Sequence, residues 1–307
     1  MNPRRSFEGA RCLVTGASSG LGQAIAEHLV RRGASVLLTG RSLIRLETTV
    51  QTLVQAGARP DDVLAVDADL TEEEGRHKVV HVASRHFGAL DLVVNAAGVG
   101  ANGHFDTHDS EVLRRVFEIN VFALIEMTRA VLPLLRRGDY PSLVNLGSIV
   151  ARRGLPGRSE YSASKFAVAG FTESIRAEWS KFGIHVLLLN PGFTATRFES
   201  NLLIDTSRYP TQHKRVMKPD QVARRTLEAI LQGKHELTLT TEGRLLVLVN
   251  HLFPWVVDQG FARFTRRVFN DVVQASAFAN EASTSRNKRL PGPHFRLKMH
   301  KLKNKGD

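Results

Sequence analysis

The feature that most constrains the fold of this 307-residue chain is a regular alternation between short apolar runs and longer amphipathic stretches. Six apolar runs have the length of buried parallel strands, and they occupy residues 11–14, 35–38, 63–66, 91–94, 142–146 and 184–189. Amphipathic stretches of helical length lie between them, at residues 21–32, 42–56, 72–87, 110–136 and 160–182. This alternation predicts an α/β fold in which a doubly wound, mainly parallel, Rossmann-like sheet carries helices on both faces. Residues 236–240 supply a seventh strand.

Composition narrows the class of protein further. Cys12 is the one cysteine and lies in an apolar run, so no intrachain disulfide can form and we expect this thiol to be buried in a strand. The twelve histidines show no metal-ligand spacing, and we expect no metal site. The first residues lack the apolar core of a signal peptide, which favours a cytoplasmic, reducing compartment.

A glycine-rich turn follows the first predicted strand directly. It reads Gly16-Ala17-Ser18-Ser19-Gly20-Leu21-Gly22 and leads into a predicted helix. Glycines allow the backbone to approach a pyrophosphate closely, while the helix N-terminus supplies free amides and partial positive charge. A tight strand–helix connection without a ligand is the alternative. The sequence predicts that a dinucleotide binds at Gly16, Ser18, Ser19, Gly20, Leu21 and Gly22.

The end of the second predicted strand indicates which nicotinamide cofactor is preferred. Enzymes that prefer NAD place a carboxylate there to bind the ribose 2′-hydroxyl, whereas a 2′-phosphate needs a cation. Gly40 occupies the position of the acid and Arg41 follows it. The missing acid and the guanidinium favour NADP(H), with a hydroxyl contact from Ser18 or Ser19. The alternative is that Arg41 is merely exposed in a loop.

Three polar residues at fixed spacing indicate the chemistry. Ser148, Tyr161 and Lys165 follow one another at intervals of thirteen and four residues. The four-residue step places the phenol of Tyr161 and the ammonium of Lys165 on one helix face, one turn apart. A neighbouring cation favours the phenolate, so we expect a lowered tyrosine pKa that suits proton transfer near neutral pH. Ser148 lacks the glycine-flanked elbow of a hydrolase nucleophile.

These motifs, in this order, resemble those of the short-chain dehydrogenase/reductase family over about residues 8–240, in its NADP-preferring type. The resemblance implies a catalytic tetrad of Asn120, Ser148, Tyr161 and Lys165. Tyr161 would protonate the carbonyl oxygen of a substrate while hydride arrives from the nicotinamide, and Ser148 would hydrogen-bond the same oxygen. Lys165 would bind the nicotinamide ribose, and Asn120 would hold a water that links Lys165 to solvent. For Asn120 the alternative is a helix-packing amide.

The resemblance also implies cofactor contacts beyond the glycine turn. Asp69 and Leu70 match the adenine contact, although Asp69 alternatively caps the next helix. After the fourth strand, Asn95 would tie neighbouring strands together while the small residues Ala96 and Gly98 admit the cofactor. Three residues after the sixth strand resemble the loop that grips the nicotinamide carboxamide, namely Gly192, Thr194 and Thr196.

The motifs together predict an oxidoreductase that transfers hydride between NADP(H) and a ketone or secondary alcohol, with Tyr161 as general acid and base. The alternative is a catalytically silent dinucleotide-binding or scaffold protein at a membrane surface. In the family, residues 150–158 and the segment after Gly192 form the pocket wall. The apolar side chains of that segment predict an apolar substrate, namely Phe193, Phe198, Leu202, Leu203 and Ile204. Its basic residues either meet an acidic group or are solvated, namely Arg208, His213, Lys214 and Arg215.

The chain is expected to divide into a dinucleotide-binding catalytic domain (1–243), an apolar and amphipathic helical extension (244–279) and a basic, disordered tail (280–307). The tail has eight Lys/Arg and no acid between residues 286 and 305, which is two thirds of the net charge of +12. Two interpretations of the extension stay open. It binds peripherally to the inner face of an anionic membrane, which would favour a lipophilic substrate and a place in lipid metabolism, or it packs on the domain or in a dimer contact. A homo-oligomer is expected, and nucleic acid is not, because no nucleic-acid motif accompanies the charge.

Overall fold

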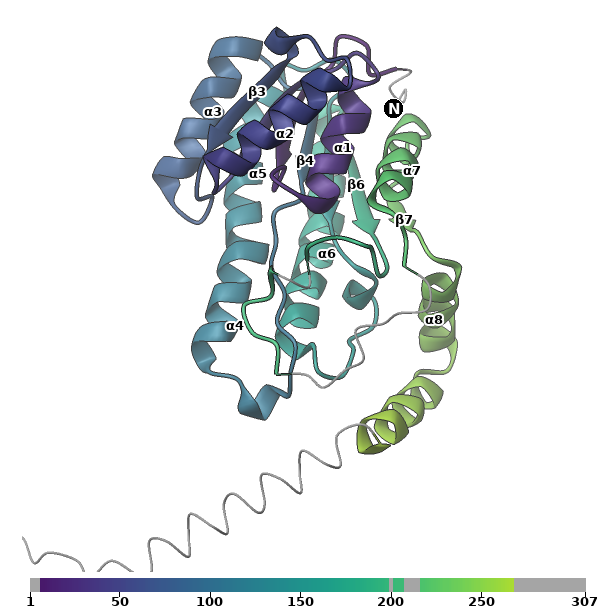
Figure 1. Ribbon diagram of the computed structural model, residues 1–307. Coiled ribbons are helices and arrows are strands. Elements are labelled where there is room, and N and C mark those ends of the chain that lie inside the picture. The colour runs from purple at the N-terminus through teal and green to yellow at the C-terminus, as the bar shows by residue number, and fades with distance from the viewer. Residues whose placement is uncertain (1–5, 199–200, 207–215, 268–307) are drawn as a thin grey trace, which may run out of the picture. The chain divides into compact units, whose positions relative to one another are not determined.

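The computed structural model of the protein describes residues 6–198, 201–206 and 216–267. Its centre is a seven-stranded parallel sheet with strand order β3-β2-β1-β4-β5-β6-β7 (Figure 1), which confirms the predicted fold class. The strands are β1 (Arg11–Thr15), β2 (Ser35–Gly40), β3 (Val63–Asp67), β4 (Leu92–Asn95), β5 (Ser142–Leu146), β6 (His185–Asn190) and β7 (Glu236–Thr238). The order reverses direction between β1 and β4. Ligands of such sheets bind at this reversal, outside the carboxyl ends of the strands.

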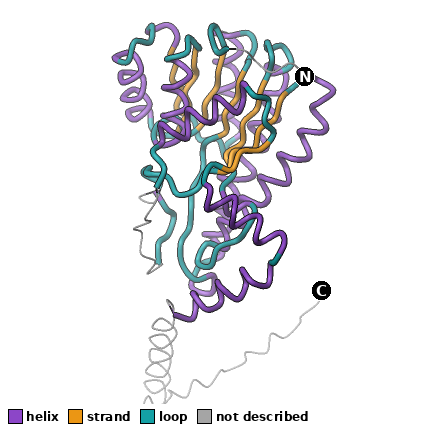
Figure 2. The backbone as a smooth tube through the Cα atoms, turned by 90° about the vertical axis from the view of Figure 1, so that its right-hand side faces the viewer, coloured by secondary structure: helices purple, strands orange, loops and turns teal. Residues whose placement is uncertain are grey.

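Helices cover both faces of the sheet (Figure 2). One face carries α1 (Gly20–Val30), α2 (Leu43–Gln55) and α7 (Pro219–Leu231), and the other carries α3 (Glu73–Phe87), α5 (Ala123–Leu135) and α6 (Ser159–Trp179). Strand β1 shows why both faces need cover, because Cys12 and Val14 belong to one core cluster while Leu13 belongs to the other. All three are fully buried, so the strand has a continuous apolar sequence, and the expected burial of Cys12 is confirmed.

The long helix predicted at 110–136 is interrupted by one wider turn. It consists of α4 (Ser110–Phe117), the π-helical turn η3 (Glu118–Phe122) and α5. Such turns insert an extra residue into a helix and are frequent at functional sites. The turn carries Asn120. Short 3-10 helices complete the domain, namely η1 (Pro60–Asp62), η2 (Phe105–Thr107), η4 (Ile149–Ala151) and η5 (Ser180–Phe182).

The chain after β7 forms two helices. Helix α8 (Thr241–Leu252) is capped by Thr240, whose hydroxyl accepts a hydrogen bond from the amide of Gly243 at 3.1 Å, and a second helix spans Pro254–Arg267. Contacts divide the chain into the compact units Met1–Phe261 and Ala262–Asp307, so α8 belongs to the unit that contains the sheet, past the boundary expected at 243. Within the described residues, no single helix is long and apolar enough to cross a membrane. The sharply bent pair of α8 and Pro254–Arg267 meets that length and composition only jointly. The expected tail lies outside the described residues.

Candidate active site

A cavity of about 530 Å³ lies at the carboxyl ends of the central strands. Most of the residues predicted for the site line it, namely Gly16, Ser18, Ser19, Gly20, Leu21, Gly22, Arg41, Asp69, Leu70, Ala96, Gly98, Ser148, Tyr161, Lys165, Gly192, Thr194 and Thr196. The predicted residues Asn95 and Asn120 are buried and do not line it. Segments that follow strands β1 to β6, together with the start of α6, therefore meet at one cavity, as the parallel sheet requires.

The glycine turn leaves room that only glycine provides. Gly16 has a φ of +65°, and a Cβ on it would lie 2.8 Å from the backbone nitrogen of Ala97. A Cβ on Gly22 would lie 2.5 Å from the carbonyl oxygen of Gly16. Backbone atoms of the glycine turn therefore pack directly against the backbone of Ala97 and against the first turn of α1. Helix α1 has no acidic residue in its first turn and no side-chain cap from Ser19, and these features suit an anion such as a pyrophosphate at its N-terminus.

The end of β2 combines close packing with positive charge. A Cβ on Gly40 would lie 3.3 Å from the Ser18 hydroxyl oxygen, which is tight contact. Arg41 and Arg45 line the same cavity. Asp67 is the register partner of Gly40 on β3, and its carboxylate pairs with Lys78 at 2.8 Å. Arg45 was missed by sequence reasoning, although its position four residues after Arg41 at the start of α2 was a signal.

Asp69 shapes the turn after β3. Its carboxylate accepts hydrogen bonds from the amide and the hydroxyl of Thr71, at 3.0 and 2.7 Å. Burial raises the pKa of Asp69, but the Thr71 hydrogen bonds and the charges of Arg115 and Arg41 outweigh it and leave the pKa below its ordinary value. Helix α3 begins at Glu73, with Glu72 and not Asp69 at its N-cap, so the capping alternative is wrong. The adenine contact stays a prediction.

Ser148 and Tyr161 come together from two elements. Ser148 is the N-cap of η4, and its hydroxyl accepts a hydrogen bond from the amide of Val150 at 3.3 Å. Tyr161 is the third residue of α6 and hydrogen-bonds with Ser148. Burial raises the pKa of Tyr161, while the Ser148 hydrogen bond and the Arg158 charge lower it by less. The pKa lowering expected from the spacing is therefore wrong, because burial of the phenol raises its pKa by more than the neighbouring groups lower it.

The position of the Lys165 ammonium explains why it does not lower the pKa of Tyr161. Its Nζ donates a hydrogen bond to the carbonyl oxygen of Leu146 at 2.7 Å and lies 5.8 Å from the centre of the Tyr161 ring. The side chain is buried, and burial lowers the pKa of Lys165 from 10.5 to about 8. Lysine and tyrosine share one helix face as predicted, but the ammonium is directed to the end of β5.

The two asparagines predicted for the site are buried and lie outside the lining of the cavity. Asn95 Nδ2 donates to Asn145 Oδ1 on the adjacent strand at 2.9 Å, as expected of a residue that ties strands together. Asn120 Oδ1 accepts from the amide of Val99 at 2.8 Å, and its Nδ2 donates to the Val99 carbonyl at 2.9 Å and to Ser164 Oγ at 3.0 Å. These bonds are those of the helix-packing alternative. The water link to Lys165 stays a prediction.

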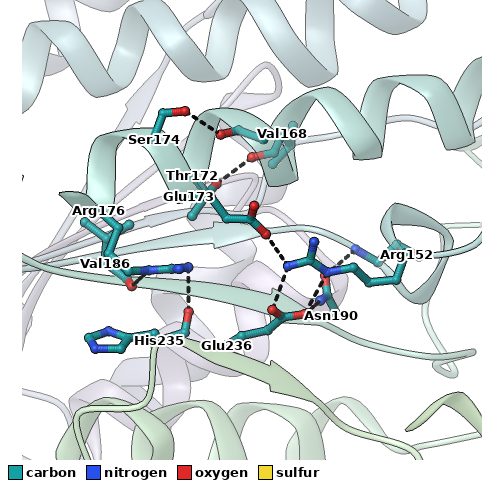
Figure 3. A network of polar contacts seen from close by, with 12 residues as sticks. Arg152, Val168, Thr172, Glu173, Ser174, Arg176, Val186, Asn190, His235 and Glu236 are labelled. Carbon is teal, nitrogen blue, oxygen red and sulfur yellow. Dashed lines mark hydrogen bonds and ion pairs between the residues drawn. The ribbon is translucent and has the colours of Figure 1, made fainter. Parts of the chain in front are cut away.

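An ion-pair network that the sequence did not reveal joins Arg152, Glu173 and Glu236 (Figure 3), and Asn190 links it to the backbone of Ser148. Asn190 Oδ1 accepts from the Ser148 amide at 3.2 Å, and Asn190 Nδ2 donates to Glu236 Oε1 at 2.8 Å. Arg152 binds Glu236 through two nitrogens, at 3.0 and 2.6 Å, and also pairs with Glu173. The Glu236 hydrogen bonds raise the pKa of Arg152 above its ordinary value. The backbone that carries Ser148 is thus tied to the edge strand β7.

A second polar pair lies directly before Tyr161. His108 Nδ1 and Glu160 Oε1 are 2.7 Å apart, and the two side chains are only 1 % and 2 % exposed. Burial raises the pKa of Glu160, but bonds with the backbone, His108 and Ser159 lower it below its ordinary value. The pair joins the start of α6 to the loop that leads into α4. The residues are 52 positions apart, and no sequence motif links them.

The part of the cavity next to Tyr161 is lined mainly by apolar side chains. Ile149, Val150 and Leu155 line it, within the predicted 150–158 wall or next to it, together with Phe193 and Phe198. The Phe198 ring lies 5.5 Å from the Tyr161 ring. Arg158, at the end of the predicted 150–158 wall, adds a cation here, 5.4 Å from the centre of the Phe193 ring.

The prediction for the rest of that segment was partly wrong. Leu202, Leu203 and Ile204 do not line the cavity, because their segment runs along residues 100–102. The Leu203 amide donates to the Gly100 carbonyl at 2.9 Å, and the Asn102 amide donates to the Ile204 carbonyl at 3.0 Å. The four basic residues at 208 and 213–215 lie outside the described residues.

Comparisons with known proteins agree with this geometry. The family model described as short chain dehydrogenase matches residues 10–206. An uncharacterized oxidoreductase, YxnA, of Bacillus subtilis (strain 168) is 29 % identical over 278 residues, which are 89 % of this chain and 75 % of the relative. A dehydrogenase/reductase SDR family protein 7-like of Dictyostelium discoideum is 30 % identical over 261 residues, covering 83 % of this chain and 82 % of the relative.

Solved structures give the same result. A short chain dehydrogenase/reductase from Burkholderia phymatum in complex with NAD is 26 % identical with a TM-score of 0.73, over 82 % of this chain and 96 % of that one. An alcohol dehydrogenase from Thermococcus sibiricus complexed with 5-hydroxy-NADP is 26 % identical with a TM-score of 0.67, over 76 % of this chain and 96 % of that one. The fold and the family match define an oxidoreductase that acts on alcohol or carbonyl groups. The chain belongs to the short-chain dehydrogenase/reductase family.

Proposed function

We propose that the protein is an NADP(H)-dependent oxidoreductase that interconverts an apolar ketone and its secondary alcohol. The observation that carries the proposal is the hydrogen-bonded pair of Ser148 and Tyr161, with Lys165 one turn further along α6, at a cavity whose substrate end is apolar. The residues of the glycine turn and the end of β2 would hold the dinucleotide. When bound, the dinucleotide supplies the hydride.

The chain's own residues supply the proton. Burial raises the pKa of Tyr161, so the phenol is protonated at neutral pH and donates its proton to a carbonyl oxygen. This protonation state is the one that reduction of a carbonyl requires. Ser148 hydrogen-bonds the same oxygen, and its backbone is fixed by Asn190. With a pKa of about 8, Lys165 is mostly protonated at neutral pH and stabilises the phenolate that remains after proton transfer.

Positive charge at the end of β2 supports the preference for NADP(H). Arg41 and Arg45 line the cavity next to Ser18, and the position of an NAD-selective acid is Gly40. A carboxylate there would repel a 2′-phosphate, whereas a guanidinium binds it through charged hydrogen bonds. Such a contact contributes about 1.5–3 kcal/mol. That energy corresponds to roughly ten- to more than hundred-fold discrimination against NADH.

The substrate class follows from the lining of the cavity. Ile149, Val150, Leu155 and Phe198 surround the space near the Tyr161 ring, which favours an apolar ketone over a charged one. An apolar substrate of this kind partitions into lipid, so an enzyme that acts on it would meet it at a membrane surface. Lipid metabolism is therefore the proposed setting.

The test is a panel of apolar and polar ketones, followed by the absorbance of NADPH or NADH, for the wild type and Tyr161→Phe. We expect NADPH-dependent turnover of apolar ketones by the wild type. The phenylalanine variant should lose activity and keep its affinity for NADPH, because the lost hydroxyl donates a proton and does not hold the phosphates. Tight NADPH binding by a wild type that turns over no member of the panel would support the silent-binder alternative. Near-normal activity of Tyr161→Phe would remove the tyrosine from its role.

A further inference from the structure

Helix α8 has two opposite faces that differ in their surroundings. One face carries Gly243, Val247 and Asn250 and contacts the domain. Val247 packs against a cluster that includes Ile149, and a Cβ on Gly243 would lie 2.8 Å from the Ile149 side chain. Asn250 Oδ1 accepts a hydrogen bond from Arg153 at 3.1 Å. This face fixes α8 on the sheet domain next to Ile149, which lines the cavity.

The other face is apolar and exposed. Leu245, Leu248 and Leu252 are 60 %, 54 % and 57 % exposed. With about 100° between successive helical residues, these three leucines point away from Gly243, Val247 and Asn250. The chain continues with more exposed apolar side chains as it leaves α8. We call the six residues the C-terminal ridge, namely Leu245, Leu248, Leu252, Phe253, Trp255 and Val256.

Six exposed apolar side chains within twelve consecutive residues are typical of a binding surface, and charge indicates the partner. The chain that follows the ridge has eight Lys/Arg and no acid between residues 286 and 305, and the whole protein carries a net charge of +12. A second copy of the chain would bring the same positive charge against the first and be repelled. An anionic lipid surface offers apolar contact together with opposite charge, and tryptophan is typical of the lipid–water interface.

We propose that the C-terminal ridge docks the protein on an anionic membrane, with the ridge side chains in the interfacial layer and the net positive charge of the chain favouring anionic headgroups. The inner face of α8 packs on Ile149, which lines the cavity, so the docked surface adjoins the apolar end of the active site. For a protein docked in this way the substrate class is a ketone dissolved in lipid, and this assignment rests on the proposed function.

The experiment is co-sedimentation of the full-length protein with vesicles, without substrate or nucleotide. Phosphatidylcholine vesicles are compared with mixed phosphatidylcholine–phosphatidylserine vesicles, at low and high salt. We expect binding to the anionic vesicles only, weakened by salt because the charges are screened. The ridge variant Leu248→Ser/Trp255→Ser should lower the partition coefficient about ten-fold or more, since two apolar side chains no longer enter the interface.

A matched variant separates the ridge from exposed apolar residues in general. Ile44 and Phe105 are 76 % and 65 % exposed but lie elsewhere on the domain, so Ile44→Ser/Phe105→Ser should bind anionic vesicles as the wild type does. The ridge variant should also keep its turnover of a water-soluble ketone, because none of its changed residues lines the cavity. Absence of turnover with intact vesicle binding would remove the proposed function and leave the membrane surface standing.

Three results would overturn the inference. The first is a wild type that fails to pellet with anionic vesicles at low salt. The second is a ridge variant that binds them as tightly as the wild type does, because binding would then come from charge alone. The third is a ridge variant that changes from dimer to monomer in sedimentation velocity while its vesicle binding is unaltered, which would assign the ridge to a second copy of the chain.

Discussion

Replacing Lys165 with methionine should abolish turnover and make the nucleotide-free protein more stable at neutral pH. Burial alone lowers the pKa of this lysine from its ordinary 10.5 to about 8, and no carboxylate in the described part of the chain contributes to that shift. A pKa change of this size corresponds to about 3 kcal/mol of unfolding free energy lost at neutral pH. The buried lysine therefore lowers the stability of the folded protein at neutral pH.

Methionine is close to lysine in length and is apolar, so it can occupy the same buried space. It cannot donate the 2.7 Å hydrogen bond to the carbonyl oxygen of Leu146, and that loss costs about 1 kcal/mol. The expected net gain for Lys165→Met is about 2 kcal/mol of unfolding free energy at neutral pH.

The pH dependence of this gain has a defined sign. Below pH 8 the lysine is charged in both the folded and the unfolded chain, so the folded wild type bears the full burial penalty. Between pH 8 and 10.5 the folded protein has released the proton while the unfolded chain still holds it, so wild-type stability rises relative to the variant. Above pH 10.5 the penalty is gone and the advantage of the methionine disappears.

Urea unfolding of the nucleotide-free proteins, from neutral pH to about pH 10.5, measures this difference. Lys234→Met changes an exposed lysine and serves as the control, with no expected gain and no pH-dependent difference. A Lys165→Met variant less stable than the wild type at neutral pH would refute the reasoning. A stability difference that does not vary between neutral pH and about pH 10.5 would do the same.

Three further changes test the cofactor end and the support of the tyrosine. Arg41→Ala should lower kcat/KM for NADPH about ten- to hundred-fold and leave NADH kinetics little changed, with exposed Arg85→Ala as control. Equal use of both cofactors by the wild type would contradict it. Gly16→Ala should weaken dinucleotide binding about ten-fold or more in calorimetry, because φ is +65° and the new methyl meets the Ala97 backbone. Unchanged affinity would mean that the turn shifts freely. Glu160→Gln should lower the unfolding free energy by about 1–3 kcal/mol and reduce kcat more than it raises KM, because the buried His108 loses its charged partner beside Tyr161. An unaltered kcat would limit the pair to a structural role.

Local patterns in the sequence determined the architecture and the main chemical groups. Continuous apolar runs specify strands buried on both faces, so the parallel sheet followed from patterning, as Cys12, Leu13 and Val14 show. The glycine turn could also be predicted from the sequence, because the close approach of Gly16 and Gly22 depends on residues within one turn. The spacing of Tyr161 and Lys165 fixed their shared helix face, since helical geometry alone decides it.

Only the tertiary structure decided the environment of those groups. Whether Tyr161 has a raised or a lowered pKa depends on its burial and on where the Lys165 ammonium points, and neither quantity is contained in a four-residue spacing. The His108–Glu160 pair depends on how separate segments meet at the start of α6.

The same holds for the supports of Ser148 and for the surface of α8. The bonds from Arg152 and Asn190 to Glu236 join loop ends to the edge strand. An apolar helix has no inner or outer side until it is docked, and the contact of Val247 with the domain decided that Leu248 faces outward. Periodicity is a property of neighbours in the chain, whereas burial and charge pairing are properties of neighbours in space.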